Sequence, residues 1–208
     1  QAIGYNRMML KKEANKITGG LSAPGKMPEG SYNQPASMCI TGSKMVDVKG
    51  TVCEGCYALK GNYVRFPAVQ KAMERRAASL THPDWVEAMA RLIVGIKHFR
   101  WYDSGDLQGP EHLKKIFEVC RATPDTMHWL PTREAWLFKY MDPEILPKNL
   151  IIRLSGMKVD GPAPSWWPWT STVSTEMKSC PASDQGNKCR DCRTCWSRDV
   201  KNVTYPKH

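Results

Sequence analysis

Residues 99–130, FRWYDSGDLQGPEHLKKIFEVCRATPDTMHWL, contain a strand–helix–strand pattern that decides the fold of this chain. The aromatic-rich run Phe99–Tyr102 predicts a strand, Pro110–Arg121 predicts a helix, and Met127–Leu130 predicts a second strand. Four residues share the apolar face of that helix: Leu113, Ile116, Phe117 and Cys120. A strand joined through a helix to the next strand is typical of a βαβ unit with parallel pairing.

The same alternation continues on both sides of this unit. Helices are predicted at Pro67–Leu80 and Asp84–Ile96, and a further helix at Glu134–Tyr140. Strands are predicted at Leu150–Leu154 and Ser171–Ser174. About four such units are too few for a closed eight-stranded barrel. The expected fold class is therefore α/β, with a partial parallel βα barrel.

The chain divides by composition into three stretches of one compact domain. Residues 1–60 are expected to form an extended leader followed by a cysteine-bearing loop, because the first fifty are rich in Gly, Pro, Ser, Asn and Lys. Residues 61–175 form the predicted barrel core, and residues 176–208 a cysteine-rich C-terminal segment. The sequence does not predict an oligomeric state.

Charge and hydropathy narrow the function classes. The formal net charge is +10, and three of the eight tryptophans lie close together at Trp166, Trp167 and Trp169, so a nucleic-acid partner is one alternative. Ionised cysteine ligands would lower that charge. No segment reaches the ~18 apolar residues of a membrane span, and the start does not look like a secretion signal. We expect a cytoplasmic protein with no membrane partner.

Seven of the eight cysteines lie in two groups. Cys39, Cys53 and Cys56 follow the pattern C-x13-C-x2-C, and the C-terminal group follows C-x8-C-x2-C-x2-C. The C-terminal group is Cys180, Cys189, Cys192 and Cys195. Thiolates at this spacing converge on a soft metal or cluster. Three thiolates leave a coordination position open for a further ligand or a substrate, whereas four close the site.

Other arrangements of the cysteines stay open. The C-terminal group suits an iron–sulfur cluster or Zn²⁺, and one of its thiols can instead complete a single shared cluster with the first group. A disulfide framework is disfavoured because 208 residues can bury a core without it. Cys120 is expected to be a buried core thiol. The histidines His82, His98 and His112 lack ligand spacing, and His128 is the one that a strand could direct into the site.

Polar residues follow the predicted strands, where parallel sheets bind ligands. Asp103-Ser104-Gly105-Asp106 follows the first strand, Thr132-Arg133-Glu134 follows the second, and Ser155 follows the third. Arg133 and Glu134 are candidates for a substrate clamp and a proton acceptor, although Glu134 also suits the first turn of a helix. Asp103 is a candidate ligand or a loop cap.

Several of these motifs together resemble radical S-adenosylmethionine (SAM) enzymes. More specifically, Thr51–Ala58, Arg100–Asp106, Trp129–Glu134 and the C-terminal cysteines resemble a phage-encoded family, the gene product eighty-eight family, over residues 35–197. The resemblance implies a cytoplasmic protein of the phage host. It also implies a [4Fe–4S] cluster on Cys39, Cys53 and Cys56, with one iron left to chelate SAM for reductive cleavage.

The resemblance assigns further residues. Ser104, Gly105 and Asp106 take the position of the turn that binds the SAM amine, with Tyr57 beside the cluster; Asp106, Asp103 and Arg133 are the candidate catalytic residues. One or two clusters are expected, with zinc as an alternative at the C-terminal cysteines. The long C-x13-C spacing departs from the usual C-x3-C. Two alternatives are a metal-stabilised nucleic-acid-binding protein without catalysis and an electron-transfer or redox-sensing cluster protein.

Overall fold

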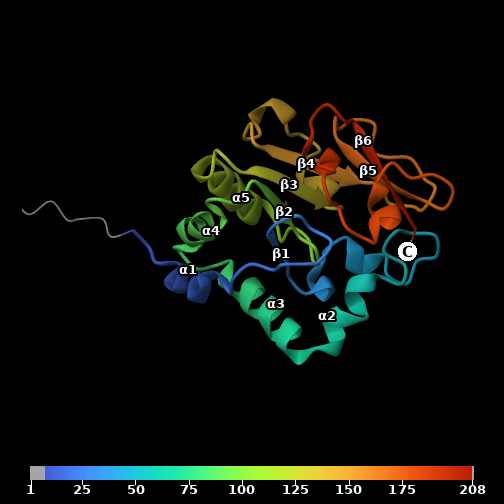
Figure 1. The fold of residues 1–208 in the computed structure, drawn as a ribbon. Helices are drawn as coiled ribbons and strands as arrows, with labels where there is room; N and C mark the ends of the chain where they lie inside the picture. The colour runs from blue at the N-terminus through green and yellow to red at the C-terminus, as the bar shows by residue number, and fades with distance from the viewer. Residues whose placement is uncertain (1–7, 208) are drawn as a thin grey trace, which may run out of the picture.

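The computed structural model describes residues 8–207 and is built around one parallel sheet (Figure 1). Its six strands lie in chain order and every neighbouring pair is parallel. The strands are β1 (Ser31–Tyr32), β2 (His98–Trp101), β3 (Met127–Thr132), β4 (Leu150–Ser155), β5 (Thr170–Ser174) and β6 (Asn202–Pro206). Strands β1 and β6 are the two edges, so the sheet is open. The predicted α/β class with an open parallel sheet is confirmed.

Helices accompany the first half of the sheet. They are α1 (Lys11–Thr18), α2 (Asn62–Arg65), α3 (Pro67–Ser79), α4 (Trp85–Ile93) and α5 (Pro110–Ala122). Helix α4 packs between α1 and α5, and α2 and α3 follow one another below the sheet in Figure 1. The 3-10 turns are η1 (Ala36–Met38), η2 (Gly42–Lys44), η3 (Tyr57–Leu59), η4 (Ala135–Leu137), η5 (Pro143–Ile145), η6 (Pro181–Gln185) and η7 (Thr194–Trp196). Within residues 8–207, no helix combines the length and apolar character needed to cross a bilayer.

One face of the sheet carries the core that faces the helices. Phe99 and Trp101 of β2 are fully buried there, and the Trp101 ring lies 6.2 Å from that of Trp85 on α4. His128 of β3 is buried on the same face, where it accepts a hydrogen bond from Trp101 Nε1 at 3.2 Å and contacts the Thr123 hydroxyl at 2.8 Å. Alternation along each strand brings these residues to one side.

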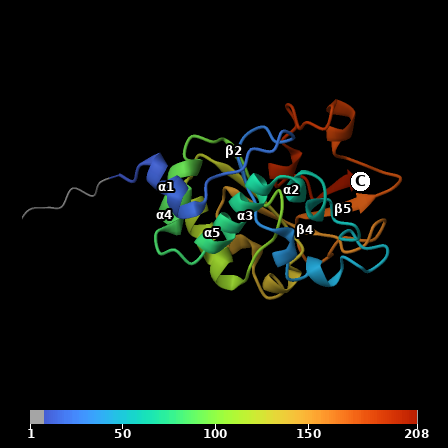
Figure 2. The ribbon, with the colours of Figure 1, turned by 90° about the horizontal axis from the view of Figure 1, so that it is seen from below.

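The opposite face of the sheet is covered by the C-terminal segment. Arg100, Trp129 and Arg153 lie on this face in the middle of the sheet. Trp196 packs edge-on against Trp129, with ring centroids 5.2 Å apart, and donates from Nε1 to the Phe99 carbonyl at 3.0 Å. The segment after β5 therefore returns across the sheet, as the red end of the ribbon shows in Figures 1 and 2.

The predicted core elements agree with α3, α4 and α5 and with strands β2 to β5 to within a few residues. The prediction of a helix at Glu134–Tyr140 is wrong, because only the 3-10 turn Ala135–Leu137 forms there. Glu134 has non-helical backbone angles, and its carboxylate bonds to Thr41 and Trp136 instead of serving a helix N-terminus. The further strand β6 was not predicted from the sequence.

The segment expected to be an extended leader contains two regular elements. Helix α1 is polar and buries only Ala14 and Thr18, so its sequence carries little apolar periodicity. It is held by packing against Ala88 and Leu92 of α4, and such short helices depend on tertiary contacts. Strand β1 is two residues long and adds to the sheet through backbone pairing with β2. The proposed division of the chain at residues 60 and 175 stays a prediction.

Two expectations about isolated side chains can be followed in the structure. Cys120 is fully buried on α5, as expected of a core thiol. His128 faces the helices and makes hydrogen bonds to Trp101 and Thr123, so it points away from the polar strand ends. His112 is also buried, and its Nε2 lies 2.7 Å from the Tyr102 hydroxyl. Both histidines are satisfied core residues.

Candidate metal centre

The three N-terminal cysteines are brought together by the loops between β1 and α2. Gly42 lies between two of them: a Cβ at this glycine would stand 3.4 Å from Cys53 Sγ and 3.8 Å from Cys39 Sγ. Burial, followed by repulsion from Asp106, Cys56 and Cys53, raises the pKa of Cys39 to about 12, and burial also raises the pKa of Cys53. Three thiols whose charged forms repel one another need a cation to ionise together.

Asp106 lies beside these thiols at the carboxyl end of β2. Its carboxylate accepts from the Thr132 hydroxyl at 2.6 Å, the Arg133 amide at 2.9 Å and the Leu107 amide at 2.8 Å. Burial nevertheless raises its pKa to about 6. A carboxylate has room for about four hydrogen bonds, so one acceptor position remains for an ammonium or hydroxyl donor.

Asp103, unlike Asp106, makes contacts that connect several segments of the chain. Its carboxylate accepts from the Ser22 hydroxyl at 2.6 Å, the Asn33 amide at 3.0 Å and the Tyr63 hydroxyl at 3.0 Å. Its carbonyl oxygen accepts from the Tyr57 hydroxyl at 2.7 Å. The residue thus joins the segment before β1, the end of β1 and helix α2. Tyr57, predicted to lie beside a cofactor, is therefore held at the end of β2.

The turn Ser104-Gly105 packs on Gln34, two residues after the end of β1. Ser104 Oγ donates to the Gln34 carbonyl at 2.9 Å, and Gly105 has φ +83° with Gln34 backbone and side-chain atoms 2.9 Å from where a Cβ would lie. Gln34 is fully buried, and its carboxamide interacts with the Tyr32 hydroxyl but makes no other side-chain hydrogen bond among the described residues. A buried amide with hydrogen-bonding positions to spare beside the predicted cofactor turn is available to a polar ligand.

Arg133 and Glu134 lie on the other side of the cysteines. Arg133 interacts electrostatically with Cys39 and Cys53, lowering their pKa values against the larger effect of burial, and its Nε finds no partner within residues 8–207. Glu134 is fully buried and accepts both the amide and the hydroxyl of Thr41, two residues after Cys39. The predicted substrate clamp thus lies near the thiols, whereas Glu134 holds the cysteine loop.

The C-terminal cysteines gather around β6. The Cys180 amide donates to the Thr204 carbonyl at 3.1 Å. Tyr205 follows Thr204 in β6, and its hydroxyl lies 3.1 Å from Cys195 Sγ. Cys180 and Cys195 are buried, and Cys189 packs against the same apolar cluster. Burial raises the pKa of Cys195 to about 11, and Cys180 adds to this rise. Cys192 is held next to Cys189 by its amide, which donates to the Cys189 carbonyl at 2.9 Å.

The donor chemistry of both groups suits a thiophilic metal. All eight cysteines are free thiols, so no disulfide competes for them. Among residues 8–207, no three His, Cys, Asp or Glu side chains are already placed at the spacing of a metal-binding set. Cys39, Cys53 and Cys56 would hold one group, and the four C-terminal cysteines a second.

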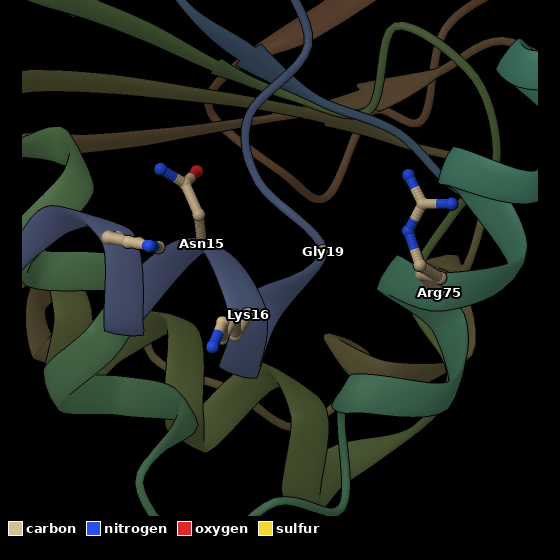
Figure 3. A pocket seen from close by; sticks show the side chains of 5 residues that line it. Asn15, Lys16, Gly19 and Arg75 are labelled. Atoms are coloured by element: carbon tan, nitrogen blue, oxygen red, sulfur yellow. The ribbon is translucent and has the colours of Figure 1, made fainter.

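Two surface hollows lie outside the thiol groups. One, of about 400 Å³, is lined by Glu144 and by the tryptophan loop, in which Trp166 is half exposed and Trp167 and Trp169 are buried. The other, of about 680 Å³, is lined by Lys12, Asn15, Lys16, Gly19 and Arg75. Figure 3 shows these side chains on α1 and α3, on either side of Gly19.

Some site residues could not be found from the sequence. Thr41 meets Glu134 across 93 positions of the chain, and Gln34 reaches Gly105 from a stretch without periodicity. Arg100 lies in a strand whose alternation predicts its face but not its partners. No local pattern in the sequence signals contacts between residues so far apart along the chain.

The fold and this site define an α/β protein with an open parallel sheet and free thiols gathered at the strand ends. Residues 6–198 match the model of one family, described as Gene product 88, and the chain belongs to that family. The resemblance found in the sequence is confirmed at the level of the family. No curated protein and no solved structure matches the chain.

Proposed function

We propose that this protein holds an iron–sulfur cluster on Cys39, Cys53 and Cys56 and is a radical-SAM-like enzyme. The observation that carries the proposal is the convergence of the Cys39 and Cys53 sulfurs at Gly42, beside Asp106 at the carboxyl end of β2. When bound, a cluster with three thiolate ligands supplies an electron and an open iron for the reductive cleavage of SAM. The open sheet in chain order is compatible with a partial barrel of this class.

The residues of the chain have distinct tasks in this proposal. Asp106 keeps one acceptor position for the SAM amine, and Ser104 and Gly105 shape the turn before it. Gln34 offers a buried amide to a polar group of the ligand. Arg133 contributes a positive charge beside the thiolates, and Glu134 fixes the loop of Cys39 through Thr41.

The test begins with anaerobic purification and quantification of iron, sulfide and zinc per chain. EPR of the reduced protein is then compared with and without SAM, and 5′-deoxyadenosine is measured. We expect iron and sulfide, a spectrum altered by SAM, and release of 5′-deoxyadenosine. Iron without any response to SAM would leave an electron-transfer or redox-sensing cluster, and zinc alone would overturn the proposal.

Variants locate the cluster. The changes C39A, C53A and C56A are each expected to lower bound iron and to abolish the response to SAM. The matched control is C120A, since Cys120 is buried on α5 outside both cysteine groups. Equal loss of iron in C120A and C53A would point to general unfolding, which circular dichroism would reveal.

The hollow between α1 and α3 favours a second candidate function, nucleic-acid binding. Lys12, Lys16 and Arg75 contribute three cations, and no carboxylate lies among the described residues that line it. Within residues 8–207 none of the three makes an ion pair. Cations in an open hollow suit the phosphates of a nucleic-acid backbone.

Salt titration of oligonucleotide binding tests this second function. Because each phosphate contact contributes about −0.9 to the slope of log K against log salt on duplex DNA, K12A/K16A/R75A should reduce the slope by about 2–3. The control K139A/K148A/K158A removes the same charge from exposed sites elsewhere. Equal effects of the two triple variants would exclude a specific role for the hollow.

A further inference from the structure

Arg100 is a half-buried cation in the middle of the sheet. The Asp103 carboxylate and the hydroxyl group of Tyr205 act on it electrostatically. Its guanidinium lies over the Trp129 ring, 4.8 Å from the centroid, and Nη1 lies 3.8 Å from Met27 Sδ. Within the described chain, Nε has no hydrogen-bond partner and no carboxylate lies within ion-pair distance. A guanidinium with a buried and unpaired Nε is stabilised by an anion nearby.

The C-terminal cysteines lie next to this cation. Cys189 donates its amide to the Lys26 carbonyl at 3.0 Å, adjacent to the Met27 that Arg100 contacts. Trp196, directly after Cys195, bonds to the carbonyl of Phe99 in the same strand as Arg100. Arg100 lies close enough to Cys189 and Cys195 to act on both side chains electrostatically.

A second guanidinium lies on the same face. Arg153 of β4 is fully buried and donates to the carbonyls of Cys195 at 3.0 Å, Thr194 at 3.1 Å and Ser197 at 2.8 Å. Its hydrogen-bond acceptors are all carbonyl oxygens, and within residues 8–207 it makes no ion pair. A fully buried cation, Arg153, and a half-buried one, Arg100, therefore border one group of four thiols.

We propose that Arg100 and Arg153 compensate the charge of an anionic four-thiolate metal centre on Cys180, Cys189, Cys192 and Cys195. Four thiolates around Zn²⁺, or around a [4Fe–4S]²⁺ cluster, carry a net charge of about −2, which matches the two guanidinium groups. Arg100 is a positioning residue that acts through this charge and is not itself a ligand. The inference goes beyond the proposed function, because it requires neither SAM nor the N-terminal cluster.

The test uses the full chain with C39A/C53A/C56A, so that any metal retained belongs to the C-terminal group. Zn²⁺ affinity is measured by competition with a chelator, and iron–sulfide reconstitution is followed by absorbance and EPR. These two arms distinguish zinc from an iron–sulfur cluster. On this background, R100M should lower the apparent metal affinity by about tenfold or more, and R100K should restore most of it. For a cluster, R100M should also shift the reduction potential to a lower value.

The matched control is R198M. Arg198 also lies over a tryptophan, with its guanidinium 4.9 Å from the Trp169 ring, but it bonds to the carbonyls of Pro147 and Leu150. Its loss should lower stability without lowering metal affinity. The proposal is overturned if R100M binds metal as tightly as its parent, if R198M loses as much affinity as R100M, or if the folded C39A/C53A/C56A chain binds no metal. A protein without N-terminal iron that still binds metal through the C-terminal group would refute the proposed function alone.

Discussion

The carboxylate of Glu134 accepts both the amide of Thr41, at 2.9 Å, and its hydroxyl, at 2.6 Å. This pair of bonds ties the end of β3 to the loop that carries Cys39. Glu134 is fully buried, and its carboxylate oxygens are paired by these donors and by Trp136 Nε1 at 2.7 Å. The position of Cys39 is therefore coupled to the sheet through a side chain 93 residues away from Thr41.

The change T41V removes the hydroxyl donor and keeps the side-chain shape. A hydrogen bond to a charged group is worth about 1.5–3 kcal/mol, so we expect the loop to open more readily and less iron to be retained. Amide hydrogen exchange of residues 39–45 and iron per chain measure the effect. The control T175V removes a hydroxyl that bonds to Asp160 at 2.7 Å on the exposed surface. Unchanged exchange in T41V would refute the coupling.

Buried His128 makes stability sensitive to acid. Burial lowers its pKa to about 3, below the ~6.5 of an unfolded chain, so its contribution to stability is complete above about pH 6.5 and is lost as the pH falls toward 3. We expect H128Q to flatten the fall in the free energy of unfolding between pH 6.5 and 3.5, measured with urea. H128Q should keep part of the dependence of the free energy of unfolding on pH, because burial also lowers the pKa of His112 to about 3.

The control for this prediction is H82Q, since His82 is only partly buried and its ring accepts from the Asp84 amide near the surface. H82Q should keep the slope of the parent protein. A slope in H128Q as steep as in the parent would show that His128 does not titrate with unfolding.

Arg153 anchors the C-terminal segment to the sheet. The change R153M leaves the buried carbonyl of Cys195 and the partly buried carbonyl of Ser197 without their donor, so we expect a loss of about 3 kcal/mol or more in the free energy of unfolding. Limited proteolysis should then cut first within residues 180–207. R121M removes an exposed arginine on α5 and should cost less than about 0.5 kcal/mol. Equal stability of the two variants would contradict this account.

Gly105 is required for two separate reasons that a paired variant distinguishes. Its φ is +83°, and an added Cβ would meet Gln34 at 2.9 Å, whereas Gly95 has φ +93° and no atom within 4 Å of an added Cβ. We expect G95A to cost about 1–2 kcal/mol for the backbone conformation alone. G105A should cost about 1–3 kcal/mol more, because of crowding. Thermal or urea unfolding measures both, and equal losses would show that Gln34 yields without cost.

The apolar periodicity of residues 67–155 was sufficient to predict the main helices and strands. Helix α5 and strands β2 and β3 bury regular faces, such as Leu113 and Ile116 on the helix and Phe99 and Trp101 in the strand. Their partners are close in sequence, so the pattern is local. The turn at Ala135–Leu137 was mistaken for a helix because its deciding interaction, Glu134 with Thr41, is not local.

The sequence by itself determined the α/β class, the order of the central elements, the two groups of thiols and the polar strand ends, because these depend on periodicity and spacing along the chain. Only the tertiary structure decided that α1 and β1 form, that β6 forms the far edge of the sheet, and that Thr41, Gln34 and Arg100 meet the site. Such contacts join residues tens of positions apart. They depend on which faces pack together, and a one-dimensional pattern does not contain that information.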